Sequence, residues 1–138
     1  MSEQANVELI LSIYDMFRRG EIPAILENLD PDSSFETEAP PSVPYAGVHH
    51  GRDGAGRFFA GVATMDEIQL EMTPFAAQGD NVVTSGRYRA RIRATGRRID
   101  VPLVHLWTIR NGKVVRFQNL SNTAAIAEAY GSAAAGAR

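Results

Sequence analysis

The sequence contains no cysteine, which excludes disulfides, thiol catalysis and metal sites built on thiolates. Charge of one sign is also lacking: 14 Lys and Arg against 16 Asp and Glu give a net charge of −2. No overall basic field therefore points to nucleic acid or to an anionic membrane. No apolar run is long enough to span a bilayer, and the start "MSEQANVELI" lacks the basic-then-apolar pattern of a secretory leader. We expect a cytoplasmic protein.

The chain has enough residues for one domain with a sizeable core. It contains 138 residues, of which 44% are apolar, an ordinary fraction for a globular protein. The final stretch, "GSAAAGAR", is of low complexity and carries few groups that could pack. We expect a single domain over residues 1–130 and a flexible tail over 131–138.

Helical periodicity dominates the first half of the sequence. Apolar residues at helical spacing from Val7 to Phe17 predict a first helix that ends at Gly20, and Pro23 suits the first turn of a second. Residues 30–39 predict a turn and a short strand. The proline-rich stretch "PPSVPYAGVHHG" predicts a loop, and "RDGAGRFFAGVAT" predicts a third helix.

After residue 67 the apolar period changes from that of a helix to two. Strands are predicted near 68–77, 81–94, 98–109 and 113–121, separated by turns such as "RNGK", with a last short helix over 123–130. This order predicts an α+β domain: a strongly bent, mostly antiparallel sheet covered on one face by the N-terminal helices. Three short helices seldom fill the concave side of such a sheet, so we expect a pocket between them.

The strand over 81–94 indicates which of its faces is buried. Arg87, Arg89, Arg91 and Arg93 alternate with Tyr88, Ala90 and Ile92. Since side chains alternate across a strand, the apolar set faces the helices and the arginines face away. An anion-binding stripe is one interpretation of the arginines. We favour a solvated or subunit-facing surface on which they pair with carboxylates.

Three segments in order resemble one known family. They are "GEIPAILENLDPDSSFE", "PYAGVHHGRDGAGRFF" and "VHLWTIRNGKVVRFQNLSNTAAI". In these segments the sequence resembles the SnoaL-like branch of the nuclear transport factor 2 superfamily, and the resemblance covers about residues 5–130. Ketosteroid isomerase, limonene epoxide hydrolase and small polyketide cyclases belong to the same superfamily. The resemblance implies the cone-shaped α+β fold, whereas activity must be argued from the site.

The resemblance also shows which catalytic groups this chain lacks. Ketosteroid isomerase uses a carboxylate base together with a tyrosine and a protonated aspartic acid as oxyanion donors. When the chain is aligned on the family motifs, these positions are Thr37, Ile13 (one residue before Tyr14) and Val104. The resemblance therefore implies that this mechanism is lost.

The two other known mechanisms lose their carboxylates in the same way. The Arg-x-Asp motif of limonene epoxide hydrolase corresponds to Arg87-Tyr88-Arg89, which has no acid. The aspartate of the polyketide cyclases corresponds to Asn122, and an amide cannot take up a proton at neutral pH.

Two ionisable side chains remain as candidates for a general base. Strict alternation places His105 and Trp107 opposite Val104 and Leu106, hence on the outer face, where the histidine would pack at a subunit interface. A bulge would instead turn His105 inward as a base with an unperturbed pKa near 6.5. Glu38 would replace the lost base if a twist turned it inward; otherwise it is solvated.

Polar residues gather where the last strand meets the last helix. Asn119 and Ser121 share a face with Phe117, the inner face by the family pattern. Ser121 or Asn122 could cap the helix that starts at Thr123. The alternative, which we favour, is that Asn122 touches the cavity.

The adjacent His49 and His50 would bind a metal only if carboxylates such as Glu36 or Glu38 converged on them. We expect no metal and no cofactor.

The predicted pocket is apolar with a few polar groups, the usual form of a small-molecule site. Its predicted ligand-binding residues are Tyr14, Thr37, Tyr45, Phe58, Phe59, Tyr88, Val104, Leu106, Phe117, Asn119 and Asn122.

Two classes of function remain open for this pocket. One is a cofactor-free isomerase, cyclase or hydrolase on a hydrophobic carbonyl compound, with His105 or Glu38 as base. The other is a non-catalytic binding domain that lost the family's acid and base residues. We also expect a homodimer through the outer sheet face, because Leu103, His105 and Trp107 would otherwise leave an exposed apolar patch.

Overall fold

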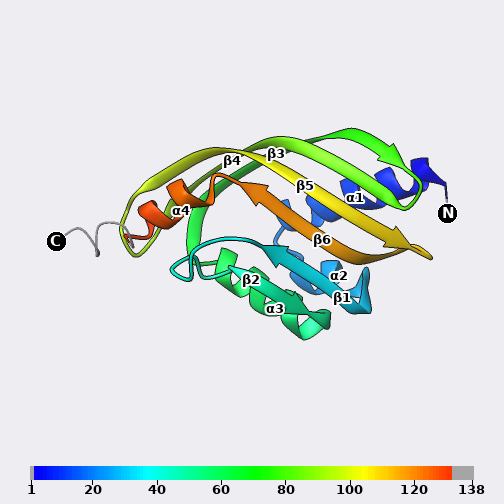
Figure 1. The fold of residues 1–138 in the computed structure, drawn as a ribbon, viewed down its shortest axis with the longest axis horizontal. Coiled ribbons are helices and arrows are strands. Elements are labelled where there is room, and N and C mark those ends of the chain that lie inside the picture. Colours follow the sequence, from blue (N-terminus) through cyan, green and yellow to red (C-terminus); the bar gives the residue numbers. More distant parts are fainter. Residues whose placement is uncertain (1, 132–138) are drawn as a thin grey trace.

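The computed structural model describes residues 2–131 and consists of four helices and one bent sheet (Figure 1). The predicted tail lies, except for Gly131, outside the described residues. In chain order the elements are α1 (Glu3–Arg18), α2 (Ile22–Glu27), β1 (Leu29–Thr37), β2 (Gly47–His50), α3 (Gly51–Val62), β3 (Met65–Gln78), β4 (Asn81–Ile92), β5 (Arg98–Arg110), β6 (Lys113–Ser121) and α4 (Thr123–Ala129).

The end of α1 and the start of α2 lie where the sequence predicted them, and a cap that was not predicted begins α1. Ser2 caps α1, since its hydroxyl accepts a hydrogen bond from the amide of Ala5 at 3.0 Å. Gly20 follows α1 with a φ of +72°, a conformation that glycine adopts without steric cost. Pro23 lies in the first turn of α2, where its missing N–H has no partner to lose.

The six strands form one sheet in the order β2-β1-β6-β5-β4-β3. Only β1 and β6 pair in parallel; the other neighbours are antiparallel. Helix α1 contacts β3 and β4, α3 contacts β1 and β2, and α4 lies at the end of the molecule opposite the N-terminus (Figure 1). The predicted α+β class, the mostly antiparallel sheet and the N-terminal helical cover are confirmed.

Two predicted boundaries were wrong. The stretch predicted as a loop ends in the strand β2, whose Gly47 and His50 pair with Thr37 and Ser34 of β1. The three prolines of that stretch precede Gly47, so every residue of β2 keeps its amide donor. The strand β3 begins at Met65, three residues before the predicted start.

The outer face of the sheet carries the predicted charge ladder. Arg91 binds Asp66 through two hydrogen bonds of 2.9 and 2.7 Å, and Arg87 binds Asp100 at 2.7 Å. Arg93 departs from the pattern, because its guanidinium donates to backbone carbonyls, including that of Ala63. The interpretation as a surface of ion pairs is confirmed. Pairs this exposed contribute little to stability.

No helix in residues 2–131 is long and apolar enough to cross a membrane.

Gly86 allows the backbones of β3 and β4 to approach closely. A Cβ added at this position would lie 1.6 Å from the backbone oxygen of Glu71 and 3.0 Å from the Cα of Met72. These are backbone atoms, so no side-chain rotation relieves the overlap. The two strands can keep their present separation only if position 86 has no side chain.

We therefore expect Gly86→Ala to destabilise the fold by about 3 kcal/mol, because strand backbones must separate to admit the methyl group. The matched control is Gly56→Ala in α3, where an added Cβ meets nothing within 4 Å. That change should stabilise the protein by about 0.5–1 kcal/mol through helix propensity. Urea unfolding of the three proteins measures both effects. Equal stabilities for Gly86→Ala and wild type would contradict the close approach of the two strands at this position.

Candidate functional site

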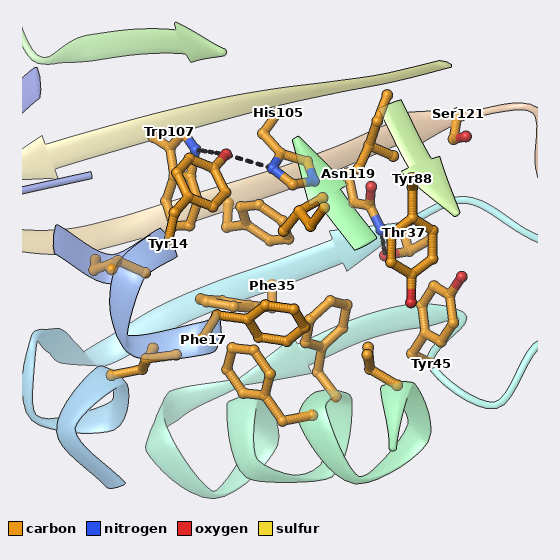
Figure 2. A pocket seen from close by; sticks show the side chains of 18 of the residues that line it. Tyr14, Phe17, Phe35, Thr37, Tyr45, Tyr88, His105, Trp107, Asn119 and Ser121 are labelled. Atoms are coloured by element: carbon orange, nitrogen blue, oxygen red, sulfur yellow. Dashed lines mark hydrogen bonds between the residues drawn. The ribbon is translucent and has the colours of Figure 1, made fainter. Parts of the chain in front are cut away.

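A cavity of about 70 Å³ lies between the helices and the concave face of the sheet. Aromatic side chains from the helices, the strands and the β1–β2 loop form most of its wall (Figure 2). They are Tyr14, Phe17, Phe35, Tyr45, Phe58, Phe59, Tyr88, Trp107 and Phe117. The polar lining consists of Thr37, His105, Asn119, Ser121 and Thr123. Within the described chain, no Asp, Glu, Lys or Arg lines this cavity.

The register of the sheet arranges the strand contributions in rows. Phe35, Phe117 and Trp107 are direct neighbours across β1, β6 and β5. The ring centroids are 4.7 Å apart for Phe35 and Phe117 and 4.5 Å apart for Trp107 and Phe117. Directly opposed residues share one face of a sheet, so the three rings form a continuous aromatic floor.

A second row, one alternation further along the strands, is polar. Thr37 pairs with Asn119, Asn119 with His105, and His105 with Thr84, so the row crosses β1, β6, β5 and β4. Thr37, Thr84 and His105 are all buried. We call these four residues the polar row.

Tyr14 of α1 contacts two residues of the polar row, Thr84 and His105. Its hydroxyl oxygen lies 2.6 Å from Thr84 Oγ1 and 2.6 Å from His105 Nδ1. The indole N–H of Trp107 donates to the same oxygen at 3.1 Å. Figure 2 shows the three rings converging on this oxygen. A buried tyrosine hydroxyl with three partners fixes both the helix and the imidazole in place.

Burial dominates the protonation of the site. It lowers the pKa of His105 to about 3, and the nearby Asn119 amide opposes this shift only in part. It also raises the pKa of Tyr14 above the ordinary range, although the hydrogen bonds from Thr84 and Trp107 partly counteract it. Both groups are therefore neutral near pH 7.

Asn119 is the least satisfied member of the polar row. Its amide nitrogen donates a long hydrogen bond of 3.4 Å to Thr37 Oγ1 (Figure 2). Its Oδ1 atom is buried and has no hydrogen-bond partner of ordinary geometry among residues 2–131. A buried carbonyl without a donor costs about 1–3 kcal/mol, and the interaction of the Asn119 side chain with His105 relieves only part of that cost.

The structure places eight of the predicted ligand-binding residues on the cavity wall. They are Tyr14, Thr37, Tyr45, Phe58, Phe59, Tyr88, Phe117 and Asn119. That they bind a ligand stays a prediction.

The predicted facing of β5 was wrong. Val104 and Leu106 are half-buried residues on the outer side, whereas Leu103, His105 and Trp107 are buried and line the cavity. No bulge is needed, because β4 and β5 pair without a register shift. The face of β5 that carries Val104 and Leu106 also carries polar and charged residues near both ends of the strand. These residues favour contact with solvent, so this face is the outer one.

Asn122 and Glu38 do not line the cavity either. Asn122 is exposed and caps α4, since its Oδ1 accepts from the amide of Ala125 at 3.1 Å. The capping alternative is therefore the observed one, and our preference for the cavity was wrong. Glu38 is exposed and absent from the wall. Glu36 also faces outward and forms two hydrogen bonds with Arg116, which lower the pKa of its carboxyl.

Several cavity residues were missed at the sequence level, among them Ile13, Phe17, Phe35, Leu70, Leu103 and Trp107. For β5 a signal existed: Ile99, Val101, Leu103 and Ile109 share the face of Trp107. For Leu70 the alternation of β3 gives only a weak signal.

His49 does not meet a metal-binding partner. Its Nε2 lies 3.2 Å from the carbonyl oxygen of Tyr45, and its ring packs against Phe58. Residues 2–131 contain no group of three or more His, Asp or Glu side chains that could hold a metal ion.

A bent sheet that encloses an aromatic cavity under N-terminal helices defines the class of nuclear transport factor 2-like proteins. Within that class, the chain matches the SnoaL-like domain over residues 10–117 and belongs to that family. None of the curated proteins matches the chain.

The chain is also similar to several solved structures. One is TerC co-crystallized with polyporic acid, at 30% identity over 93% of this chain and 99% of that chain, with a TM-score of 0.81. A second is an NTF2-like protein of unknown function from Burkholderia pseudomallei K96243, at 28% identity over 94% and 98%, TM-score 0.82. A third is an NTF2-like protein from Burkholderia xenovorans LB400, at 27% identity over 94% and 98%, TM-score 0.84.

The depressed pKa of His105 predicts a specific pH dependence of stability. The unfolded chain takes up this proton near pH 6.5, whereas the folded chain takes it up only near pH 3. The unfolded state therefore binds more protons in this window. Stability should fall as the pH falls from 6.5 toward 3, with a slope that approaches about 1.4 kcal/mol per pH unit.

Urea unfolding of wild type and His105→Gln between pH 4 and pH 7 measures this effect, because the variant lacks the titrating imidazole. Carboxylates whose pKa is lowered, such as Glu36 and Asp66, act in the same direction below about pH 4 in every variant, so the difference between proteins isolates the imidazole. The exposed His50→Gln is the control and should follow wild type. A wild-type advantage over His105→Gln that stays constant with pH would contradict the buried neutral histidine.

Proposed function

We propose that this protein binds a small, flat and largely apolar molecule in the cavity and orients it by an oxygen atom of that molecule. The observation that carries the proposal is the pairing of an aromatic floor with the adjacent polar row. Apolar walls supply the affinity, and a few fixed hydrogen-bonding groups supply the orientation. The family membership and the polyporic acid found with TerC support an aromatic, oxygen-bearing ligand.

The site favours binding over acid–base chemistry. Positions where relatives keep a working acid or base are here Thr37, Val104, Arg89 and Asn122. Of these, only Thr37 lines the cavity, and a hydroxyl is no base at neutral pH. The Nδ1 atom of His105 shares a hydrogen bond with the Tyr14 hydroxyl, and burial keeps the imidazole neutral.

An enzymatic role is the second candidate, supported by one observation. A neutral imidazole next to a buried tyrosine can stabilise a developing negative charge on a carbonyl oxygen by hydrogen bonding. Such a cofactor-free isomerase, cyclase or hydrolase would need a substrate acidic enough to react without a protein carboxylate.

The size of the cavity sets a condition on any ligand. An apolar cavity of about 150 Å³ is known to hold benzene, roughly twice the volume found here. A bicyclic ligand therefore requires side chains to move. Phe17 and Phe59 are neighbours with ring centroids 6.2 Å apart, and they are the aromatic lining residues that are only half-buried, so their movement exposes the least new surface.

Ligand binding can be measured through Trp107, because it is the single tryptophan of the chain and lines the cavity. We expect polyporic acid or 4-phenylphenol to change its fluorescence saturably, with a dissociation constant of about 1–100 μM. Ser121→Leu fills one end of the cavity and should weaken binding at least ~10-fold.

The matched control is Gln118→Leu, three residues earlier on the opposite face of β6, which should bind as wild type does. The proposed function fails if neither compound alters the fluorescence at solubility-limited concentration. It fails also if Ser121→Leu and Gln118→Leu respond alike.

We further propose a homodimer through the outer sheet face, with a corrected set of residues. Val83 pairs with Leu106, and Val104 pairs with Leu120, so these four lie together on that face. Leu120 is 44% exposed. A second copy would cover this apolar group, and the neighbouring arginines and carboxylates can pair reciprocally across a two-fold axis.

Leu120→Glu should shift the protein toward the monomer, because two carboxylates would meet at the apolar centre of the interface. The control is Leu11→Glu on α1, since Leu11 is 42% exposed and lies away from the outer face. Light scattering after size-exclusion chromatography at micromolar concentration gives the masses. A monomeric wild type, or equal masses for both variants, would overturn the dimer.

A further inference from the structure

We propose that His105 Nε2–H and Asn119 Oδ1 form a donor–acceptor pair that recognises one neutral hydroxyl group, that of a phenol or an enol. This inference rests on the proposed function and specifies the polar group of its ligand. The hydroxyl would accept a hydrogen bond from the imidazole and donate one to the amide. Its aromatic body would lie on the floor formed by Phe35 and Phe117.

The count of protons around Tyr14 sets the tautomer of His105. The indole of Trp107 can only donate, so it occupies one lone pair of the tyrosine oxygen. The hydroxyl then has one proton to give and one lone pair left. One of Thr84 and His105 therefore donates to Tyr14, and the other accepts from it.

Only one of the two arrangements uses every buried proton. If His105 donated from Nδ1, Tyr14 would donate to Thr84, and the proton of Thr84 would have no acceptor. Thr84 is fully buried and makes no other side-chain hydrogen bond within the described chain. If Thr84 donates to Tyr14 and Tyr14 donates to Nδ1, the hydroxyls of Thr84 and Tyr14 and the Nδ1 atom of His105 are all satisfied. The proton of the imidazole is then on Nε2.

The position of Nε2 turns this tautomer into a recognition element. In Figure 2 this nitrogen lies on the side of the ring away from Tyr14 and faces Asn119. His105 and Asn119 are directly opposed across β5 and β6, and both line the cavity. Asn119 Oδ1 makes no hydrogen bond of ordinary geometry, and the interaction of its side chain with His105 is the contact that a hydroxyl would bridge. A donor and an acceptor therefore stand next to each other at the cavity wall.

A hydroxyl is the smallest group that satisfies both atoms at once, because it accepts and donates through one oxygen. An ether or an isolated carbonyl leaves Asn119 Oδ1 unpaired. A phenolate cannot donate and would bring a charge into an uncharged site. The titratable side chains of the wall are His105, Tyr14, Tyr45 and Tyr88, and none is cationic at neutral pH. The site thus selects the protonated ligand.

Three bicyclic compounds of nearly equal shape test the pair: 2-naphthol, 2-methoxynaphthalene and naphthalene. Isothermal titration calorimetry at pH 7 should show 2-naphthol binding at least ~10-fold more tightly than either of the others. Its affinity should be constant from pH 6 to pH 8 and then fall about tenfold per pH unit above the ionisation of the naphthol itself. Affinity that rises as naphtholate forms would overturn the proposal.

Variants assign the preference to the two atoms. Asn119→Leu removes the acceptor and should bring the ratio of the 2-naphthol and 2-methoxynaphthalene affinities close to one. Gln118→Leu is the control, since Gln118 precedes Asn119 on the opposite face of β6 and should leave the ratio unchanged. Equal loss of the ratio in both variants would contradict a specific role for Asn119.

The tautomer is measured in the ligand-free protein by nitrogen-15 NMR of the histidine ring. Wild type should show protonated Nε2 and unprotonated Nδ1. Tyr14→Phe removes the donor to Nδ1 and should shift the Nδ1 resonance, which a merely structural loss elsewhere would not do. A wild-type ring protonated on Nδ1, or on both nitrogens, at pH 7 overturns the proposal without any ligand.

The two levels of the hypothesis fail separately. If all three compounds bind with equal affinity, the hydroxyl preference is wrong and the proposed cavity function stands. If none of them binds, nor polyporic acid, the proposed function is wrong and the ligand preference falls with it.

Discussion

Four polar side chains from four different strands lie in one line beneath a single helix, and this registration constrains the rest of the molecule. Thr37, Asn119, His105 and Thr84 can share the buried face only if β1, β6, β5 and β4 keep their present register. Buried polar groups without partners cost about 1–3 kcal/mol each, and Tyr14 relieves that cost for Thr84 and His105. A slip of one residue would lose both the aromatic floor and the hydrogen bonds, so polar satisfaction and core packing specify the same pairing.

The elements of the fold could be predicted because their signals are local. Glycine and proline positions and the change of apolar period located the helices and every strand except β2 to within a few residues. The facing of β5 was harder, because two apolar residues, Val104 and Leu106, stand on the solvent side in the middle of the strand. The whole strand decides its face, and Ile99, Val101 and Ile109 outweigh that central pair. A prediction based only on residues 104–107 therefore assigned the inner face to Val104 and Leu106 and the outer face to His105 and Trp107.

Asn119 and Asn122 show the same limit in the candidate site. Both follow Phe117 within five residues, yet Asn119 lines the cavity whereas Asn122 caps α4. A cap needs only the amide three residues later, which the sequence contains. The environment of Asn119 depends on Thr37 and His105, which are distant in sequence, and on a parallel pairing that no local pattern encodes. The unpaired Oδ1 could not be foreseen without the register.

The loss of carboxylates from the site has a consequence for what the cavity can distinguish. A buried charge recognises a ligand mainly through opposite charge, and it requires compensating groups around it. Here Trp107, Thr84 and Tyr14 instead fix the direction of one hydrogen-bond chain that ends at His105. Each hydroxyl in that chain has a fixed donor and acceptor role, so the imidazole presents an N–H donor of defined direction without carrying a charge. Discrimination then rests on the penalty for leaving Asn119 unpaired, which is large in an apolar cavity and absent in water.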